Sequence, residues 1–373
     1  MILRAVTLLC LLAGTAHAQM STAEAARDAV RMLEESAEAL SEARGGRERV
    51  KALTEIVKGY ETGLAALRDG MRAASLKEAQ LTEDLQARDK EISQLLGVLQ
   101  SMSRAPAPAT LLHPSGPTGT ARAGMLLAEV TPGLKARADA LRADLQDVQA
   151  LRLLQEQSAA KLQEGLEGAQ EARTALSKAV ADRTDLPRRF VENPLQTAVL
   201  IAATETLEGF ASGLATIAQD EAPGSLPDIS HRKGNLPLPV QGQLLRRAGE
   251  ADAAGVRRPG VLIATGPQAV VTTPTAATIR YAGPLLNYGL VAILEPQADT
   301  LFILAGLEAV FGQTGQVLPA GDPVGLMGGE LQTDVSLSGD GAGNARPETL
   351  YIEVRELNQP VDPQDWFRTT DKG

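Results

Sequence analysis

The sequence is poor in the residues that most catalytic sites use. Among its 373 residues are one cysteine, Cys10, and three histidines, His17, His113 and His231. A catalytic zinc needs about three protein ligands, most often histidines, and a Ser–His–Asp triad needs a histidine base. Cysteine is absent beyond residue 10, which excludes disulfides from the rest of the chain. These absences predict that the chain is not an enzyme and binds no cofactor.

Charge and hydrophobic runs exclude two further classes. The chain has 36 basic and 46 acidic residues, a net charge of −10, and without a clustered basic face this argues against a nucleic-acid partner. Residues 1–18 combine a basic Arg4, a short apolar run and a small-residue end at Ala18. This pattern predicts a secretory signal peptide cut after Ala18. No later run is apolar enough to predict a membrane span.

The next part of the chain predicts a helical rod over residues 20–185. No proline occurs between Ser21 and Met102, and from Val50 onward apolar residues recur in a heptad pattern. A Pro- and Gly-rich stretch, residues 104–124, interrupts helical character, and a second helical run extends from about Met125 to Ala181. We expect an antiparallel coiled-coil hairpin with the Pro-rich stretch as its tip loop.

Residues 194–220, between the rod and the last domain, predict one helix with a wide apolar face. A face of this width must be buried against another part of the protein. The side chains expected on it are Val199, Leu200, Leu207, Phe210, Leu214 and Ile217. A linker, residues 221–235, follows.

Residues 236–368 predict a small, mostly β domain, because short β-branched runs alternate there with turn residues. The expected fold class is α+β multidomain: a coiled-coil hairpin, a regulatory helix and a C-terminal β domain. The expected strands are Val261–Ala264, Ala269–Thr272, Thr278–Tyr281, Leu290–Leu294, Thr300–Ala305, Val324–Met327 and Leu350–Val354.

Five motifs in this domain, in order, resemble the LytM family of zinc peptidoglycan endopeptidases. They are an entry strand LPLPVQGQLL (Leu236–Leu245), a Tyr-Gly turn into a strand (Asn287–Val291), a glycine-spaced segment (Gly315–Gly328), the strand ETLYIEVR (Glu348–Arg355) and the ending Val361–Trp366. The resemblance implies the LytM fold.

The resemblance also shows which site residues are missing. In active LytM enzymes a His and an Asp begin the zinc site, and here Arg258 and Leu262 hold those places. The two histidines of the strand become Thr349 and Tyr351, and a further catalytic His aligns with Gly306. The resemblance therefore implies a degenerate domain with no metal. Its groove suits a protein helix, although Thr349 and Tyr351 could equally be ordinary strand residues.

The order of rod, apolar helix and histidine-free LytM domain resembles the EnvC-type murein hydrolase activators of the periplasm. The family implies activation of N-acetylmuramoyl-L-alanine amidases that split septal peptidoglycan during cell separation. It also implies control by the FtsEX complex, whose FtsX periplasmic domain contacts the rod. The resemblance suggests that the region including Leu95, Leu99 and Leu127 makes that contact. In this family the apolar helix covers the groove until it is released.

Several alternatives remain open at this level. The apolar helix could pack permanently instead of switching, and the chain could contact peptidoglycan directly. A structural, wall-binding coiled-coil protein needs the same surfaces as an activator. An efflux adaptor also has a periplasmic hairpin, but its β segments lie on both sides of that hairpin. An active LytM endopeptidase is opposed by the histidine count.

Overall fold

The computed structural model describes residues 22–104, 116–190, 194–219, 228–252, 255–286, 288–329 and 348–368. The chain divides into two units. One unit joins residues 1–64 to residues 165–373, and the other comprises residues 65–164. The predicted signal peptide and most of the predicted tip loop lie outside the described residues.

The predicted rod is helical. Its helices are α1 (Thr22–Glu42), α2 (Gly46–Ala87), α3 (Asp89–Arg104) and α4 (Gly116–Ala181). In the 65–164 unit, ion pairs join α2 and α3 to α4 in reversed order along the chain, which makes the pairing antiparallel. These pairs are Glu78–Arg152, Arg88–Asp144 and Glu91–Arg137. In the other unit, a side chain at Gly165 would meet Leu64 and one at Gly168 would meet Tyr60, so α2 and α4 remain adjacent there.

Two boundaries of the rod differ from the prediction. The first helical run is interrupted at Arg88, whose guanidinium is 3.6 Å from both Asp144 and Glu91. The helix α4 begins at Gly116, whereas the sequence predicted a start near Met125. Pro117 lies in the first turn of α4, where the missing amide hydrogen costs nothing, so proline there does not delay the start of the helix.

The predicted β domain is a ten-stranded antiparallel sheet with the main order β1-β2-β9-β6-β5-β4-β7. Strand β8 pairs with β6 and β3, and β10 pairs with β9. The seven strands expected from the sequence are all present, within a few residues of their predicted bounds. The strands are β1 (Gly242–Arg246), β2 (Val261–Thr265), β3 (Val270–Thr272), β4 (Ala277–Pro284), β5 (Leu290–Gln297), β6 (Thr300–Val310), β7 (Val317–Leu318), β8 (Pro323–Met327), β9 (Glu348–Glu356) and β10 (Gln359–Val361).

The main core of this domain lies on one face of the central strands. It includes Phe302 and Leu304 of β6, Ile352 and Val354 of β9, and Trp366 near the end of the chain, all with no exposed surface. The Phe302 and Trp366 rings meet edge to face, 5.6 Å between centroids. Since side chains alternate along a strand, the intervening residues of β6 and β9 lie on the opposite face.

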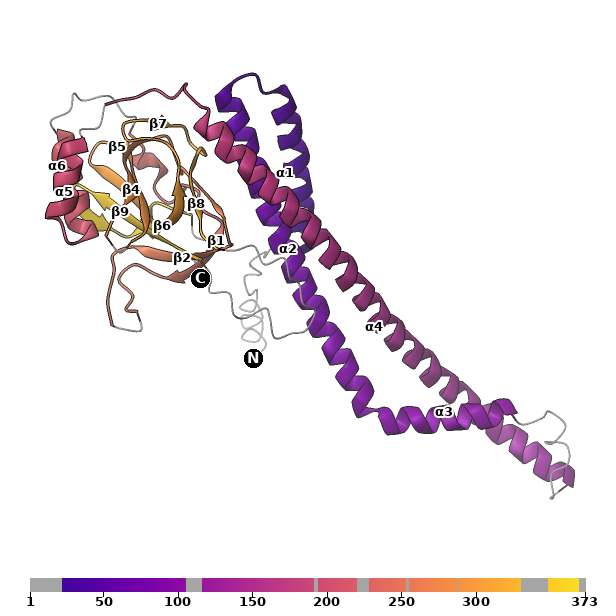
Figure 1. The fold of residues 1–373 in the computed structure, drawn as a ribbon. Coiled ribbons are helices and arrows are strands. Elements are labelled where there is room, and N and C mark those ends of the chain that lie inside the picture. The colour runs from indigo at the N-terminus through magenta and orange to yellow at the C-terminus, as the bar shows by residue number, and fades with distance from the viewer. Residues whose placement is uncertain are drawn as a thin grey trace, which may run out of the picture. The chain divides into compact units, whose positions relative to one another are not determined.

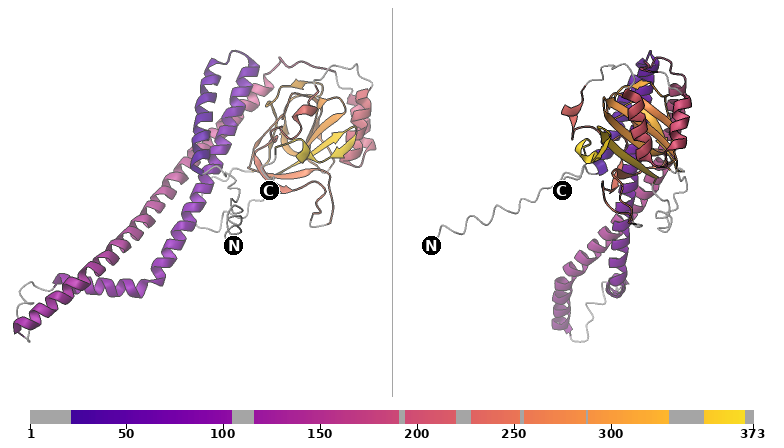
Figure 2. Two further views of the ribbon diagram at one scale, coloured as in Figure 1. Left: turned by 180° about the vertical axis from the view of Figure 1, so that it is seen from behind. Right: turned by 90° about the vertical axis from the view of Figure 1, so that its left-hand side faces the viewer.

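The predicted apolar helix is two helices, not one. They are α5 (Pro194–Ala203) and α6 (Leu207–Gln219), and both lie beside the β domain (Figures 1 and 2). The Thr206 hydroxyl accepts a hydrogen bond from the Gly209 amide at 3.0 Å and so caps the start of α6. A side chain on Gly213 would collide with Leu200, so this glycine allows α5 and α6 to approach closely. No helix among the described residues is long and apolar enough to cross a bilayer.

Candidate functional site

The strand that resembles the zinc-binding strand, β9, is central in the sheet. It pairs with β2 on one side and with β6 on the other. The odd-numbered residues Tyr351, Glu353 and Arg355 pair with Ala305, Ile303 and Leu301 of β6 and lie on the face opposite the main core. We call this surface the covered face, because helix α6 packs on it.

A chain of hydrogen bonds links the polar residues of β9. The Gly260 amide donates to the Tyr351 hydroxyl at 3.1 Å, and that hydroxyl donates to Glu353 Oε2 at 2.8 Å. Glu353 Oε1 accepts from Arg355 Nη1 at 2.8 Å, and Arg355 Nη2 donates to the Asn358 carbonyl at 2.7 Å. Burial raises the pKa of Tyr351 above its usual range, and the neighbouring Glu353 charge raises it further. Tyr351 therefore acts as a neutral donor.

Four of the five predicted groove residues lie together. Leu262 of β2 is opposite Tyr351, and Thr349 is opposite Ala264. Gly306 of β6 has φ +95°, and a side chain there would lie 2.7 Å from the Thr349 carbonyl oxygen. The glycine that takes the place of a catalytic histidine is thus required by the backbone.

Arg258 is placed differently from the other predicted residues. It lies in the loop between β1 and β2, its side chain is 47% exposed, and its Nη1 is 3.6 Å from Asp252 of the same loop. The sequence prediction missed Glu353 and Arg355 as site residues. The alternation of ETLYIEVR was the available signal, because it places both on the same face as Tyr351.

Helix α6 covers this face with apolar side chains. Leu207, Phe210 and Leu214 are buried at 3%, 0% and 7% exposure, and the Phe210 ring meets Tyr281 of β4 edge to face, 4.8 Å between centroids. The other members of this cluster include Leu285, Val291, Ile293, Leu301, Ile303, Ala305 and Tyr351, with Leu200, Ile201, Leu262 and Tyr288 packed at its border. The cover therefore includes four of the predicted helix-face residues.

The remaining residues of the predicted helix face do not extend this cover. Val199 on α5 is 60% exposed, so the prediction that it is buried is wrong. Because the helix is interrupted at residues 204–206, α5 does not continue the face of α6 as a single helix would. The Ile217 side chain lies outside the described residues. Helix α5 has no buried residue.

One charged contact joins the cover to the hydrogen-bonded chain. Arg355, 1% exposed, has its Nη2 3.6 Å from Glu208 Oε1 on α6. Glu208 itself is 70% exposed, so the ion pair is screened by solvent on one side. The described part of the covered face is thus largely apolar, with the buried Arg355–Glu353 pair beneath the helix.

The described residues hold no evident metal centre. Within the described ranges, no group of three or more His, Cys, Asp and Glu side chains is arranged to hold a metal ion. His231 lies in a short 3₁₀ helix, Ser230–Arg232, whereas His17 and His113 fall outside those ranges. The absence of an enzymatic activity stays a prediction.

Comparison with known proteins gives partial matches. The chain is homologous to the murein hydrolase activator EnvC of Escherichia coli, at 27% identity over 135 residues, covering 36% of this chain and 29% of that protein. An uncharacterized protein of Neisseria meningitidis is 30% identical over 145 residues, covering 39% of this chain and 22% of its own length. The chain therefore spans about a fifth to a third of the curated relatives it matches. No protein-family model matches it.

Solved peptidase structures also resemble part of the chain. A putative M23 peptidase from Pseudomonas aeruginosa matches 43% of this chain and 60% of its own, with 16% identity and a TM-score of 0.31. The catalytic domain of lysostaphin from Staphylococcus simulans matches 34% of this chain and 93% of its own, with 15% identity and a TM-score of 0.28.

Proposed function

We propose that this chain is a non-catalytic periplasmic activator of N-acetylmuramoyl-L-alanine amidases, acting in septal peptidoglycan splitting. The observation that carries the proposal is the packing of α6 on the covered face, which holds the strand that resembles the zinc-binding strand of LytM enzymes. A site built to cut peptidoglycan must admit its substrate. A site covered by an amphipathic helix is suited to bind a similar helix from a partner. The homology with EnvC points in the same direction.

The cover has the features of a removable element. Its buried contact comes from few side chains of α6, while α5 has none buried. Val199, a large apolar residue of α5, is exposed, so α5 contributes little to holding the cover in place. We infer that α5 and α6 inhibit the chain by occupying the surface that the amidase needs. Release of α6 would free the apolar residues of β5 and β6 and the Arg355 guanidinium for the incoming helix.

The rod would receive the controlling signal from the FtsX periplasmic domain of FtsEX. Large apolar side chains are exposed towards the distal part of the rod: Leu96 of α3 and Met125, Leu126 and Val130 of α4. Such side chains on separate helices suit a protein contact. Leu95, which the sequence analysis placed in this contact, is buried at 8% exposure, so its neighbour Leu96 is the better candidate. The side chains of Leu99 and Leu127 lie outside the described residues.

An activation assay with the whole secreted chain tests the proposal. Dye-labelled peptidoglycan is incubated with a purified zinc amidase and either the wild type or the Leu207→Ala/Leu214→Ala variant. The variant removes two buried contacts of the cover, so we expect faster dye release than with the wild type. Val199→Ala, at an exposed position of the same cover, is the matched control and should behave as the wild type. FtsX periplasmic domain added to the wild type should raise its activity towards that of the variant.

Three outcomes contradict the proposal in different ways. Dye release by the chain without amidase would identify an active hydrolase. An amidase rate unchanged by the wild type, the variant and FtsX would favour a structural or wall-binding rod. Equal activation by wild type and variant would support an activator but refute inhibition by α6. Sedimentation of each variant with peptidoglycan alone separately measures direct wall binding.

A further inference from the structure

The base of the rod contacts the β domain at strand β3, away from the cluster under α6. Val50, Leu53 and Val57 of α2 and Leu176 of α4 form a buried cluster with Val270 of β3. None of these residues belongs to the cluster beneath α6. The rod base therefore has its own apolar contact with the domain.

A buried ion pair lies within this contact. Arg173 of α4 and Glu61 of α2 have side chains 4% and 11% exposed, and Arg173 Nη2 is 3.2 Å from Glu61 Oε1. The same Glu61 oxygen accepts a hydrogen bond from the backbone amide of Val270 at 2.9 Å. Among the described strands, β3 pairs only with β8. The Glu61 carboxylate therefore accepts a hydrogen bond from the amide of an edge strand. Arg173 also reaches the Pro267 carbonyl at 3.5 Å.

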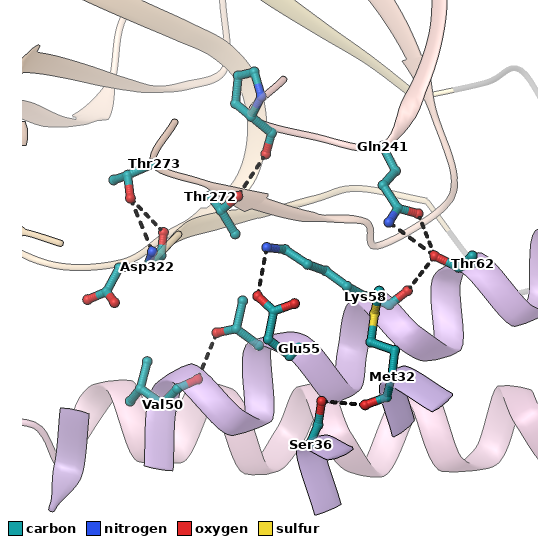
Figure 3. A network of polar contacts seen from close by, with 12 residues as sticks. Met32, Ser36, Val50, Glu55, Lys58, Thr62, Gln241, Thr272, Thr273 and Asp322 are labelled. Atoms are coloured by element: carbon teal, nitrogen blue, oxygen red, sulfur yellow. Dashed lines mark hydrogen bonds and ion pairs between the residues drawn. The ribbon is translucent and has the colours of Figure 1, made fainter. Parts of the chain in front are cut away.

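Other polar contacts follow along the same side of the domain. Figure 3 shows Thr62 of α2 and Gln241, just before β1, joined by hydrogen bonds across the contact, at 3.1 and 3.2 Å. At the end of the rod, Arg183 pairs with Asp322, the residue before β8, and both side chains are buried. The polar contacts thus involve three separate segments of the domain.

Burying the Glu61–Arg173 ion pair contributes little net stability, because both charges lose their hydration. Burial raises the pKa of Glu61, although the Arg173 charge and the Val270 hydrogen bond oppose that rise. Glu61 Oε2 and Arg173 Nε and Nη1 are buried without a hydrogen-bond partner among the described residues. Replacing such a pair with apolar residues of similar volume is often neutral or stabilising. Apolar contacts, however, allow the rod base and the β domain to pack in several relative orientations. A hydrogen bond from one particular backbone amide to the Glu61 carboxylate is compatible with only one of them.

We propose that Glu61 and Arg173 are positioning residues that lock the β domain onto the rod base in one orientation, through the Val270 edge amide. We call these two residues and the Val270 amide the edge lock. It fixes the orientation of the β domain relative to the rod base, which the apolar cluster alone does not specify. The inference goes beyond the proposed function, because it concerns the geometry of the chain and is tested without any amidase.

The test measures distances in the chain without residues 1–18, the predicted signal peptide, and therefore without Cys10. Nitroxide labels on Glu171→Cys of α4 and Gln359→Cys of β10, both exposed in the structure, report the orientation by pulsed electron resonance. We expect one narrow distance distribution in the wild type. Glu61→Leu/Arg173→Met should broaden or split it while leaving the melting temperature within a few degrees of the wild type. The pair Glu308→Cys and Gln359→Cys, within the domain, should stay narrow in every variant.

The control removes a more exposed ion pair that also joins α2 to α4. Glu78→Leu/Arg152→Met breaks a 2.7 Å pair between α2 and α4 in the other unit and should leave the Glu171–Gln359 distribution unchanged. An unchanged narrow distribution in Glu61→Leu/Arg173→Met would overturn the proposal, since the remaining contacts, apolar and polar, would then suffice to orient the domain.

Amide hydrogen exchange gives an independent test if that variant folds poorly. In the wild type the Val270 amide should be protected although it lies on an edge strand, and fast exchange there would overturn the edge lock. In the single variant Arg173→Met, Glu61 loses its ionic partner and stays buried, so Val270 exchange should rise about tenfold or more. The Phe302 amide, in the central strand β6, should not change. A Val270 rate equal to the wild type would also refute the proposal.

Discussion

The substitution Phe210→Ala separates a removable cover from a permanent part of the core. Phe210 has no exposed surface and meets the Tyr281 ring at 4.8 Å. Truncating a fully buried Phe to Ala costs about 3–5 kcal/mol. At 1.4 kcal/mol for each factor of ten, this cost corresponds to roughly a hundred- to several-thousand-fold change in an equilibrium constant.

The location of Phe210 decides which equilibrium changes. It belongs to the cluster under α6 and not to the main core that contains Phe302 and Trp366. If α6 detaches while the domain stays folded, the loss of about 3–5 kcal/mol shifts the equilibrium between attached and detached α6. Amide exchange within α6, such as that of the Phe210 amide bonded to Thr206, should then accelerate by nearly the full factor. Exchange in the central strands, and the melting temperature of the domain, should change little.

Hydrogen exchange with mass spectrometry on the whole chain measures both regions at once. The exposed position Val199→Ala controls for a loss of side-chain volume in the same cover. If Phe210→Ala accelerated exchange in α6 and in the central strands equally, α6 would unfold only together with the domain. That result would refute the reasoning that makes the cover a switch.

Three further predictions concern the sheet beneath and beside the cover. Tyr351→Phe removes the hydroxyl that donates to Glu353 and should lower the free energy of unfolding by about 1–3 kcal/mol, measured in urea. Gly306→Ala places a side chain at φ +95° against the Thr349 carbonyl and should cost about 1–3 kcal/mol in the same assay, whereas Gly321→Ala, with an open environment at φ +81°, should cost less. Burial raises the pKa of Asp322 above its ordinary value of 3.8, so the folded chain binds this proton more tightly than the unfolded chain. Its contribution to stability is present at low pH and is lost as the pH rises through the raised pKa. Asp322→Asn should therefore flatten the decline of unfolding free energy above about pH 4, and an unchanged pH profile would contradict this assignment.

Local sequence patterns predicted the strands well, because the β-branched runs are short and bounded by turns. The run around Phe302 and the one around Ile352 are examples, and both are central strands. Strand β7, only Val317–Leu318, was missed. It is held by pairing with β4 and by the Val317 amide bonding to the Pro187 carbonyl, contacts with segments far away in the sequence. No local pattern contains that information.

The break between α5 and α6 shows a second limit of periodicity. The apolar spacing from Leu200 to Leu214 fits one helix, and Thr204 and Thr206 are only mildly unfavourable within it. In the structure α5 ends before these residues. Thr206 caps the start of α6, and Gly213 of α6 leaves room for the Leu200 side chain of α5. The cap is local, but the contact of Gly213 with Leu200 depends on the two helices packing side by side, which a single helical projection cannot represent.

The sequence predicted that the candidate site lacks histidine ligands, but it did not predict the hydrogen-bonded residues that occupy the site. Missing histidines are visible in the sequence, and so is the alternation that puts Tyr351 and Arg355 on one face. The hydrogen bond from the Gly260 amide to Tyr351 required the structure, because residues 260 and 351 are brought together only by the pairing of β2 with β9.

The two contacts of the β domain place opposite requirements on their side chains. The proposed function requires the cover to leave, and its contact is mainly apolar, with Glu208 as a largely exposed charge at its border. The rod base must keep its orientation, and there Glu61 and Arg173 are buried and tied to a backbone amide. An apolar helix face can be exchanged for another helix without leaving a buried charge unpaired, whereas separating Glu61 from Arg173 would do so. The chemistry of each contact therefore favours release on the covered face and fixation at strand β3.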